Sequence, residues 1–221
     1  MTVLPMFPLG SVLLPGGYLP LHVFEDRYRE LVEDCLDGAG EFGVVLIERG
    51  SEVGGGDRRA AVGTVARIVE ATRFDDGRWA LGTVGTRRIR VVQWLADAPY
   101  PRAEIEGWGE PSAGADLVGA VEQLIPLLRR VLAAGAELGD VVAPATVTLN
   151  DDPVRASYEA VALAPLGPAD QYALLAASGA HARIEALAAL LVDEEAHLAR
   201  RLALESSPGD LGDPSDPPAS S

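Results

Sequence analysis

The chain has 221 residues, a formal net charge of −15 and 48% hydrophobic residues, a composition typical of a folded globular protein. Its 18 basic residues are all arginine. Chemistries that need a lysine, namely a P-loop, a Ser-Lys dyad and a Schiff base, are therefore excluded. The acidic balance also disfavours a nucleic-acid partner, because phosphates would be repelled on average.

The cysteine content and the hydropathy pattern indicate the expected compartment. Cys35 is the single cysteine, so no internal disulfide can form and a reducing environment is expected. No run of 18 apolar residues occurs, and the first residues lack the basic region of a signal peptide. We therefore expect a soluble, cytoplasmic protein with no membrane partner.

The N-terminal segment predicts short strands followed by one helix. Four prolines interrupt the apolar residues of the first 24 positions, and residues 19–23 alternate as a half-buried strand does. The period then becomes helical, with Asp26 as the expected N-cap and Gly38 or Gly40 as the expected end. The apolar stripe of this helix comprises Tyr28, Leu31, Val32, Cys35 and Leu36.

The remainder of the first half of the chain predicts further strands. They are expected at residues 42–47, 62–70, 79–84, 88–94 and 102–108. A loop is expected at 50–59, and Asp75-Asp76-Gly77 is expected to form a hairpin turn.

Beyond residue 110 the chain becomes rich in alanine and leucine and predicts helices. An apolar stripe runs through residues 117–132, with Pro126 inside it, and Asp152-Pro153 suits the start of a helix that ends near residue 163. Further helices are expected at 168–177 and 180–204. We therefore expect a β-rich domain at 1–110, a helical subdomain at 111–205 and a disordered acidic tail at 206–221.

Two blocks of motifs in the first half carry a family resemblance. The first block comprises Leu4-Pro5-Met6-Phe7-Pro8-Leu9, Val12-Leu13-Leu14-Pro15-Gly16, Leu19-Pro20-Leu21-His22-Val23-Phe24-Glu25 and Arg27-Tyr28-Arg29-Glu30-Leu31. The second block comprises Gly63-Thr64-Val65-Ala66, a turn at Asp76-Gly77, Gly85-Thr86-Arg87-Arg88-Ile89 and Tyr100-Pro101-Arg102-Ala103-Glu104. In order and spacing these blocks resemble the N-terminal substrate-binding domain of Lon protease.

The resemblance implies a fold and a role. The implied fold is α+β, with a PUA-like pseudo-barrel β-domain that carries one early helix and is followed by an α-helical subdomain. The implied role is non-catalytic binding of unfolded or extended polypeptide, as an adaptor or regulator of proteolysis, with a protease or chaperone as a further partner. The chain ends where the ATPase would begin, so we expect it to act without that machinery in cis.

The candidate peptide-binding surface lies where the early strand meets the helix. It comprises Phe24, Asp26, Arg27, Tyr28, Arg29 and Glu30, which we call the Phe24 rim. Charged side chains here project from the outer face of a helix whose inner face is core, and a merely solvated helix face is the alternative. We expect no catalytic residue, no cofactor and no metal ligand.

Several other motifs have structural interpretations. Residues 38–43 match G-x-G-x-x-G, but a helix precedes them and a strand follows, the reverse of a dinucleotide site. Glu194-x-x-His197 lacks the second pair that a di-iron site requires. His22 is expected to be structural, and Cys35 to be buried and inert.

Two other functions remain as alternatives. Arg87, Arg88 and Arg90 form a basic cluster that an RNA-binding PUA-like protein could use, but no stacking aromatic residue interleaves it. We expect these arginines to pair with the acidic residues of 25–37. The other alternative is a hydrolase whose site the sequence does not reveal.

Overall fold

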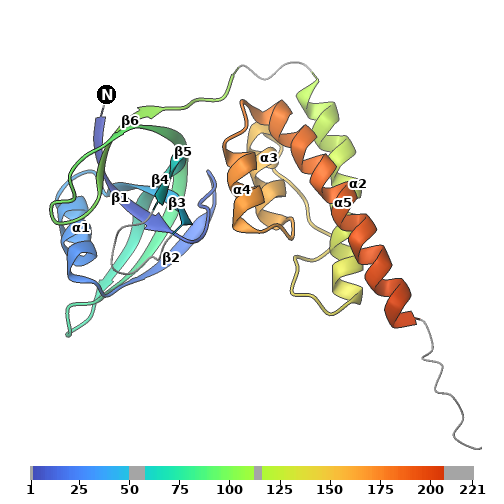
Figure 1. Ribbon diagram of the computed structural model, residues 1–221, viewed down its shortest axis with the longest axis horizontal. Coiled ribbons are helices and arrows are strands. Elements are labelled where there is room, and N and C mark those ends of the chain that lie inside the picture. Colours follow the sequence, from blue (N-terminus) through green and yellow to red (C-terminus); the bar gives the residue numbers. More distant parts are fainter. Residues whose placement is uncertain (1, 50–57, 112–115, 207–221) are drawn as a thin grey trace, which may run out of the picture.

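The computed structural model describes residues 2–49, 58–111 and 116–206. The predicted tail, most of the predicted loop at 50–59 and the segment 112–115 lie outside the described residues. A barrel of strands, residues 2–107, lies beside a helical part, residues 117–206 (Figure 1). The predicted α+β fold is confirmed.

The strands form one sheet that closes on itself. They are β1 (Thr2–Leu9), β2 (Tyr18–Val23), β3 (Glu41–Arg49), β4 (Arg58–Arg73), β5 (Trp79–Trp94) and β6 (Arg102–Gly107). Their order is β2-β5-β4-β3-β1-β6, and β6 also pairs with β5. This last pairing closes five strands into a barrel, to which β2 is added along the first half of β5. The predicted pseudo-barrel is thereby confirmed.

The long strand β5 replaces two strands that the sequence predicts. Its residues Trp79–Val84 pair with β2, and its residues 89–94 pair with β6. Between the two halves, Thr86 is skipped in the pairing with β4, where the register shifts. A bulge of this kind bends a strand without ending it. The chain therefore continues through the position where the sequence indicates a break.

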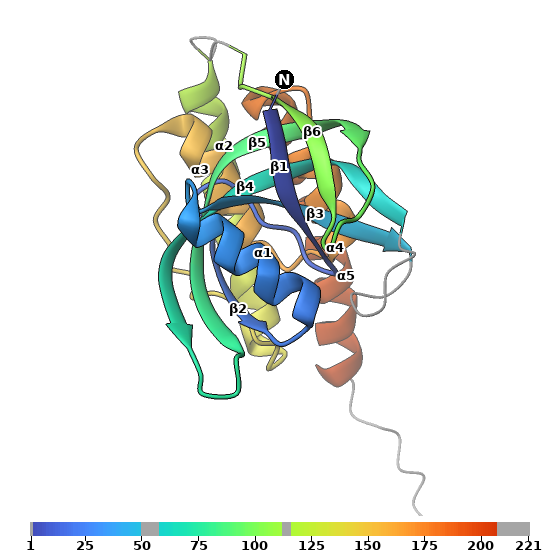
Figure 2. The same ribbon diagram turned by 90° about the vertical axis from the view of Figure 1, so that its left-hand side faces the viewer.

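The barrel core includes the helix α1 (Asp26–Asp37), which lies across the barrel beside β1 and β2 (Figure 2). Its buried residues are Tyr28, Leu31, Val32 and Cys35, as predicted, whereas Leu36 is 42% exposed. The helix ends at the predicted Gly38. Its N-cap is Glu25 and not the predicted Asp26, because Glu25 has the extended backbone of a capping residue and Asp26 is already the first helical residue.

The core of the helical part also takes in Leu14 and Val62 from the barrel. The helical part consists of α2 (Leu117–Glu137), α3 (Pro153–Leu163), α4 (Pro168–Leu175) and α5 (Ala180–Ser206). Most residues of the predicted stripes of α2 and α5 are buried: Leu117, Val121, Leu124, Leu128, Val131, Leu132, Ile184, Leu187, Leu191 and Leu198. Leu202, predicted to be buried with them, is only half-buried. Asp152 Oδ1 accepts the amides of Val154 and Arg155 at 2.9 and 3.1 Å, so the predicted N-cap of α3 is confirmed. No helix in the described ranges has the length and hydropathy needed to cross a membrane.

Candidate functional site

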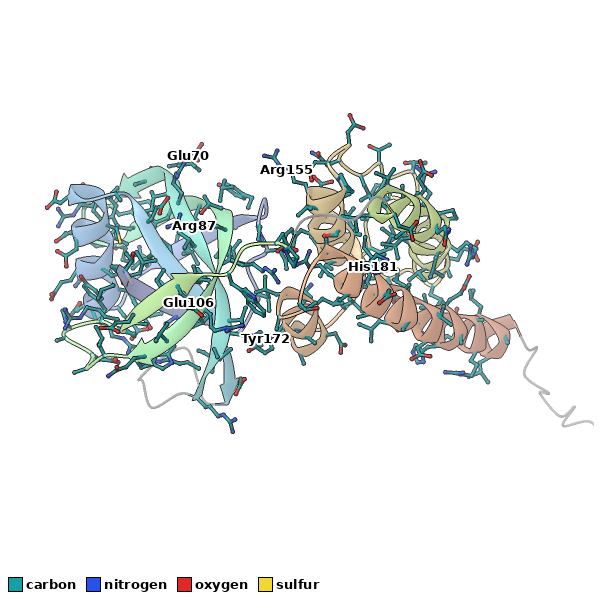
Figure 3. All side chains as sticks on the ribbon, turned by 90° about the horizontal axis from the view of Figure 1, so that it is seen from above. Glu70, Arg87, Glu106, Arg155, Tyr172 and His181 are labelled. Atoms are coloured by element: carbon teal, nitrogen blue, oxygen red, sulfur yellow. The ribbon has the colours of Figure 1, made fainter. Side chains whose placement is uncertain are left out.

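A cleft of about 730 Å³ lies between the barrel and the helical part. One wall is formed by residues 84–88 of β5 and by the turn at Pro15-Gly16, and the linker at residues 107–110 forms a second wall. The helical wall comprises Asn150, Val154, Arg155, Tyr158 and Glu159. Figure 3 shows Arg87 on the barrel, and Arg155 on the side of the helical part that faces the barrel.

Two arginines, one glutamate and one tyrosine form a buried cluster behind the cleft. Glu110 Oε1 lies 2.9 Å from Arg88 Nη2 and 2.7 Å from Arg183 Nη2, and it also accepts the Tyr158 hydroxyl. Arg183 is fully buried, and the side chain of Arg88 is 1% exposed. Two buried cations share one carboxylate, so further acceptors are required to satisfy them.

Backbone and side-chain oxygens of the helical part supply those acceptors. Arg88 Nη1 donates to the carbonyl oxygens of Leu175 and Ala177 at 2.9 and 2.7 Å. Arg183 Nε donates to the Leu174 carbonyl at 3.2 Å, and Arg183 Nη1 donates to Ser157 Oγ at 2.7 Å. The cluster therefore connects β5 and the linker to α3, α4 and α5.

The protonation states in the cluster follow from its geometry. Burial by itself raises the pKa of Glu110, but the hydrogen bond from Tyr158 and the charges of Arg183 and Arg88 outweigh burial and hold that pKa below its ordinary value. Burial raises the pKa of Tyr158, and the bond to Glu110 adds to this effect. Glu110 is therefore ionised and Tyr158 is protonated at neutral pH, and neither is poised for proton transfer.

The basic cluster of β5 pairs differently from the prediction. Arg87 pairs with Glu41 at 2.9 Å and Arg90 with Glu106 at 3.5 Å, while Arg88 pairs with Glu110. The predicted pairing with residues 25–37 is wrong, because the acids nearest to β5 come from β3, β6 and the linker. The guanidinium carbons of Arg88 and Arg90 both lie 4.6 Å from the ring centroid of Trp108, so an aromatic side chain packs on this basic cluster.

Arg155 differs from the other arginines of the cleft. It is exposed on the first turn of α3, and its guanidinium forms no ion pair with any carboxylate in residues 2–49, 58–111 and 116–206. Glu159 lies one turn further along α3, but its Oε2 accepts the backbone amide of Asn150 at 2.7 Å. The cleft therefore has one exposed positive charge with no counterion among the described residues.

The Phe24 rim divides into surface residues and one core residue. Phe24 is 57% exposed, Asp26 pairs with Arg29, and Arg29 Nη1 donates to the Asp76 carbonyl at 3.4 Å. Tyr28 is 4% exposed, and its ring stacks on Phe7 at a centroid distance of 4.1 Å. The ring of Tyr28 thus belongs to the core and not to a surface.

The charged side chains of Arg27 and Glu30, the other two residues of the rim, lie outside the core. Arg27 pairs with Glu25 at 3.1 Å, and its guanidinium lies over the Tyr28 ring at 4.5 Å. Glu30 is exposed. Beside the rim, the hairpin tip between β4 and β5 contributes Phe74, which is 39% exposed and lies 6.0 Å from the ring of His22. Exposed aromatic side chains therefore lie both on the rim, at Phe24, and on this hairpin, at Phe74.

The glycine-rich segment and Cys35 have structural roles. Residues 38–43 join α1 to β3, with the helix first. Cys35 is buried, and burial followed by the neighbouring Asp34 raises its pKa to about 12. No group of three His, Cys, Asp or Glu side chains within the described part of the chain is placed to hold a metal ion.

Comparison with known proteins decides the family. Residues 3–193 match the model described as the ATP-dependent protease La (LON) substrate-binding domain. The chain belongs to this family. The match is to the LON substrate-binding domain and not to an ATPase or a protease domain.

Relatives of the LON substrate-binding domain family include full-length proteases. The chain is 32% identical over 147 residues to Lon protease 2 of Myxococcus xanthus, a match that covers 62% of the chain and 18% of that relative. It is 26% identical over 115 residues to a LON peptidase N-terminal domain and RING finger protein of Schizosaccharomyces pombe, covering 47% of the chain and 24% of that protein. The chain thus spans about a fifth of the length of these curated relatives.

Solved structures of LON N-terminal domains have the same fold. A Lon N-terminal domain protein from Xanthomonas campestris is 30% identical with a TM-score of 0.60, and the match covers 86% of this chain and 98% of that one. The N-terminal domain of the Mycobacterium avium complex Lon protease has a TM-score of 0.62 at 19% identity, covering 88% of this chain and 98% of that one. The second likeness concerns the fold alone.

Proposed function

We propose that this chain is a non-catalytic module that binds unfolded or extended polypeptide in the cleft between the barrel and the helical part. One observation carries the proposal: a member of the LON substrate-binding domain family has a cleft of about 730 Å³ between its two parts. The substrates of a protease are polypeptides, so a polypeptide is the ligand class to expect there. The corresponding cellular role is that of an adaptor or regulator, which presents such chains to a separate protease or chaperone. The expected compartment is the reducing cytoplasm, because the chain has a single, buried thiol.

The construction of the cleft suits an extended main chain. Gly107 and Gly109 line it, and a Cβ added to either glycine would meet no atom within 4 Å. A ligand backbone can therefore approach this wall closely. Trp108 supplies aromatic surface beside it, while Arg87 and Arg155 supply charge. This combination of apolar walls and a few polar groups is typical of binding sites.

Two properties support a non-catalytic role. The chain has no lysine for a P-loop or a Ser-Lys dyad. The titratable groups behind the cleft are held in fixed protonation states, with Glu110 ionised and Tyr158 neutral. Nothing in the geometry of this cluster places an activated nucleophile beside a base.

The Phe24 rim is a second surface for the same ligand. Phe24 of the rim and Phe74 of the hairpin tip are exposed aromatic side chains, and Asp26, Arg29 and Glu30 are charged residues of the same rim. Exposed aromatic side chains with a charged border are typical of interaction surfaces. We propose that a long unfolded chain contacts this rim in addition to the cleft.

Fluorescence anisotropy with a labelled unfolded peptide tests the proposal. The wild type should bind weakly, with a dissociation constant near or above 1 µM, equivalent to about −8 kcal/mol or weaker. Gly109→Leu places a side chain in open space at the cleft and should weaken binding about tenfold, or about 1.4 kcal/mol. Gly119→Leu, on α2 away from the cleft lining, is the matched control and should leave binding unchanged.

Three results would contradict the proposal. Absence of binding at about 1 mM peptide, near −4 kcal/mol, would exclude the polypeptide ligand. Equal binding by Gly109→Leu and Gly119→Leu would exclude the cleft. Turnover of ATP or cleavage of the peptide by the purified chain would exclude the non-catalytic role.

A further inference from the structure

The charges that line the cleft differ from those of the chain as a whole. The chain carries a net charge of −15, yet the lining contains Arg87, Arg88 and Arg155 against Glu110 and Glu159. An excess of positive charge in a cleft of an acidic protein is opposite to its average surface potential. Such a local excess attracts a negatively charged ligand group even where the distant field is repulsive.

The pairing of these groups identifies the cation that is available to a ligand. Arg87 pairs with Glu41, and Arg88 is buried with Glu110. Arg155 is exposed and forms no ion pair with the described carboxylates. A ligand that enters the cleft can therefore reach the Arg155 guanidinium without displacing an existing partner.

The fork of an arginine guanidinium matches a carboxylate in geometry. Two parallel N–H donors meet the two carboxylate oxygens, which gives both strength and orientation. In a polypeptide, a carboxylate is supplied by the chain terminus or by an Asp or Glu side chain. Val154 of α3 and Val84 of β5 line the same cleft, so apolar groups next to the carboxylate would also find a surface.

We propose that the cleft recognises a carboxylate of the bound polypeptide and that Arg155 is the residue that binds it. This inference rests on the proposed function and adds a specificity to it. Peptides that present a carboxylate are selected over otherwise identical peptides that do not. The interaction at an exposed arginine is screened by salt, so the selection decreases as ionic strength rises.

Three labelled unfolded peptides of otherwise identical sequence test the proposal by anisotropy. The first has a free C-terminal carboxylate and no acidic residue, the second has a C-terminal amide and no acidic residue, and the third has a C-terminal amide and one internal Asp. The wild type should bind a carboxylate-bearing peptide about fivefold more tightly than the second peptide, the upper range for an exposed ion pair. Preference for the first alone identifies a chain terminus, and equal preference for the first and third identifies any carboxylate.

Two variants assign the selection to Arg155. Arg155→Gln should abolish the preference, so that the three peptides bind this variant with equal affinity. Arg200→Gln is the matched control, because Arg200 is also exposed and forms no ion pair with the described carboxylates but does not line the cleft. It should retain the full preference. Thermal unfolding of both variants should match the wild type, since surface substitutions change stability by about 0.5 kcal/mol or less.

The outcomes separate this inference from the proposed function. If all three peptides bind the wild type equally, or if Arg155→Gln retains the preference, carboxylate recognition by Arg155 is wrong and the polypeptide-binding role stands. If Arg155→Gln weakens the binding of all three peptides by the same factor, the residue contributes to binding in the cleft without recognising a carboxylate. The inference is again overturned. If none of the peptides binds, the proposed function fails together with it.

Discussion

The guanidinium carbon of Arg183 lies 3.7 Å from the centroid of the Tyr158 ring, and Arg183 Nη2 donates to the Tyr158 hydroxyl at 2.9 Å. The arginine belongs to α5 and the tyrosine to α3, and both reach Glu110 in the linker. The same carboxylate holds Arg88 of β5. This ion cluster therefore joins the helical part to the barrel, in addition to the apolar packing of Leu14 and Val62 against the helices.

Replacement of Arg183 should destabilise the chain strongly. Arg183→Leu removes one of the two cations that pair with the Glu110 carboxylate, and it leaves the Leu174 carbonyl without its hydrogen bond from Arg183 Nε. Breaking a buried pair in this way costs about 3–5 kcal/mol. Chemical denaturation measures the loss, with Arg200→Leu on the exposed face of α5 as the control. A loss below about 1 kcal/mol would mean that the cluster is not a determinant of stability.

The pH dependence of stability should report on Glu110. Its folded pKa lies below the ordinary value of 4.5, despite burial, because of the bond from Tyr158 and the charges of Arg183 and Arg88. The ionised group therefore stabilises the folded state at pH above 4.5, and that contribution is lost as the pH falls through the folded pKa.

Urea unfolding at a series of pH values checks this expectation. The difference in unfolding free energy between the wild type and Glu110→Gln should be largest at neutral pH and should decrease below pH 4.5. In an Arg183→Leu background the pH dependence of that difference should become smaller, because one of the charges that lowers the pKa is gone. A difference that grows on acidification would contradict the assignment.

The elements of the fold that could be predicted from the sequence are those with a local signal. The helical stripe of α1 and the Asp152 cap of α3 depend on neighbours within one or two turns, and both predictions are confirmed except for Leu36, which is exposed. The continuity of β5 through Thr86 could not be seen in this way. It depends on pairing with two different strands, β6, which follows β5 in the chain, and β2, which lies far earlier in the sequence.

Substitutions of Phe24 and Tyr28, the two aromatic residues of the rim, should differ in their effect on stability. Phe24→Ala removes a side chain that is 57% exposed and should change stability by about 0.5 kcal/mol or less. Tyr28→Ala removes a ring stacked on Phe7 in the barrel core and should cost about 3–5 kcal/mol.

Thermal unfolding together with peptide anisotropy distinguishes stability from binding at the rim. Phe24→Ala should weaken binding of a long unfolded peptide while its unfolding temperature stays near that of the wild type. Tyr28→Ala is informative on stability alone. Unchanged binding by folded Phe24→Ala would remove the rim from the proposed binding surface.

The thiol of Cys35 should be unreactive in the native protein. Burial, with the charge of Asp34 in addition, raises its pKa to about 12 from an ordinary value of 9.0, and its Sγ lies 3.4 Å from the Glu41 carbonyl. Modification by a thiol reagent at about pH 8 should be at least ~100-fold slower than in the unfolded chain, because little thiolate forms. Rapid modification under native conditions would show that α1 opens readily from the barrel.

The candidate site was harder to predict than the fold, because its residues are distant in sequence. Glu110, Tyr158 and Arg183 were not singled out, and Arg88 was expected to pair elsewhere. One signal for Arg183 does exist: it lies four and eight residues before Leu187 and Leu191, in phase with the buried stripe of α5. A charged residue at such a position requires a buried partner, although the stripe does not say which.

The strand β5 couples the cleft mechanically to the strand pairing of the barrel. Residues 84–88 form a wall of the cleft, and they lie where β5 changes its partner from β2 to β6. A ligand held against this wall restrains the point at which both pairings meet. Backbone amides of β2, none of which lines the cleft, would then exchange with solvent more slowly when the cleft is filled.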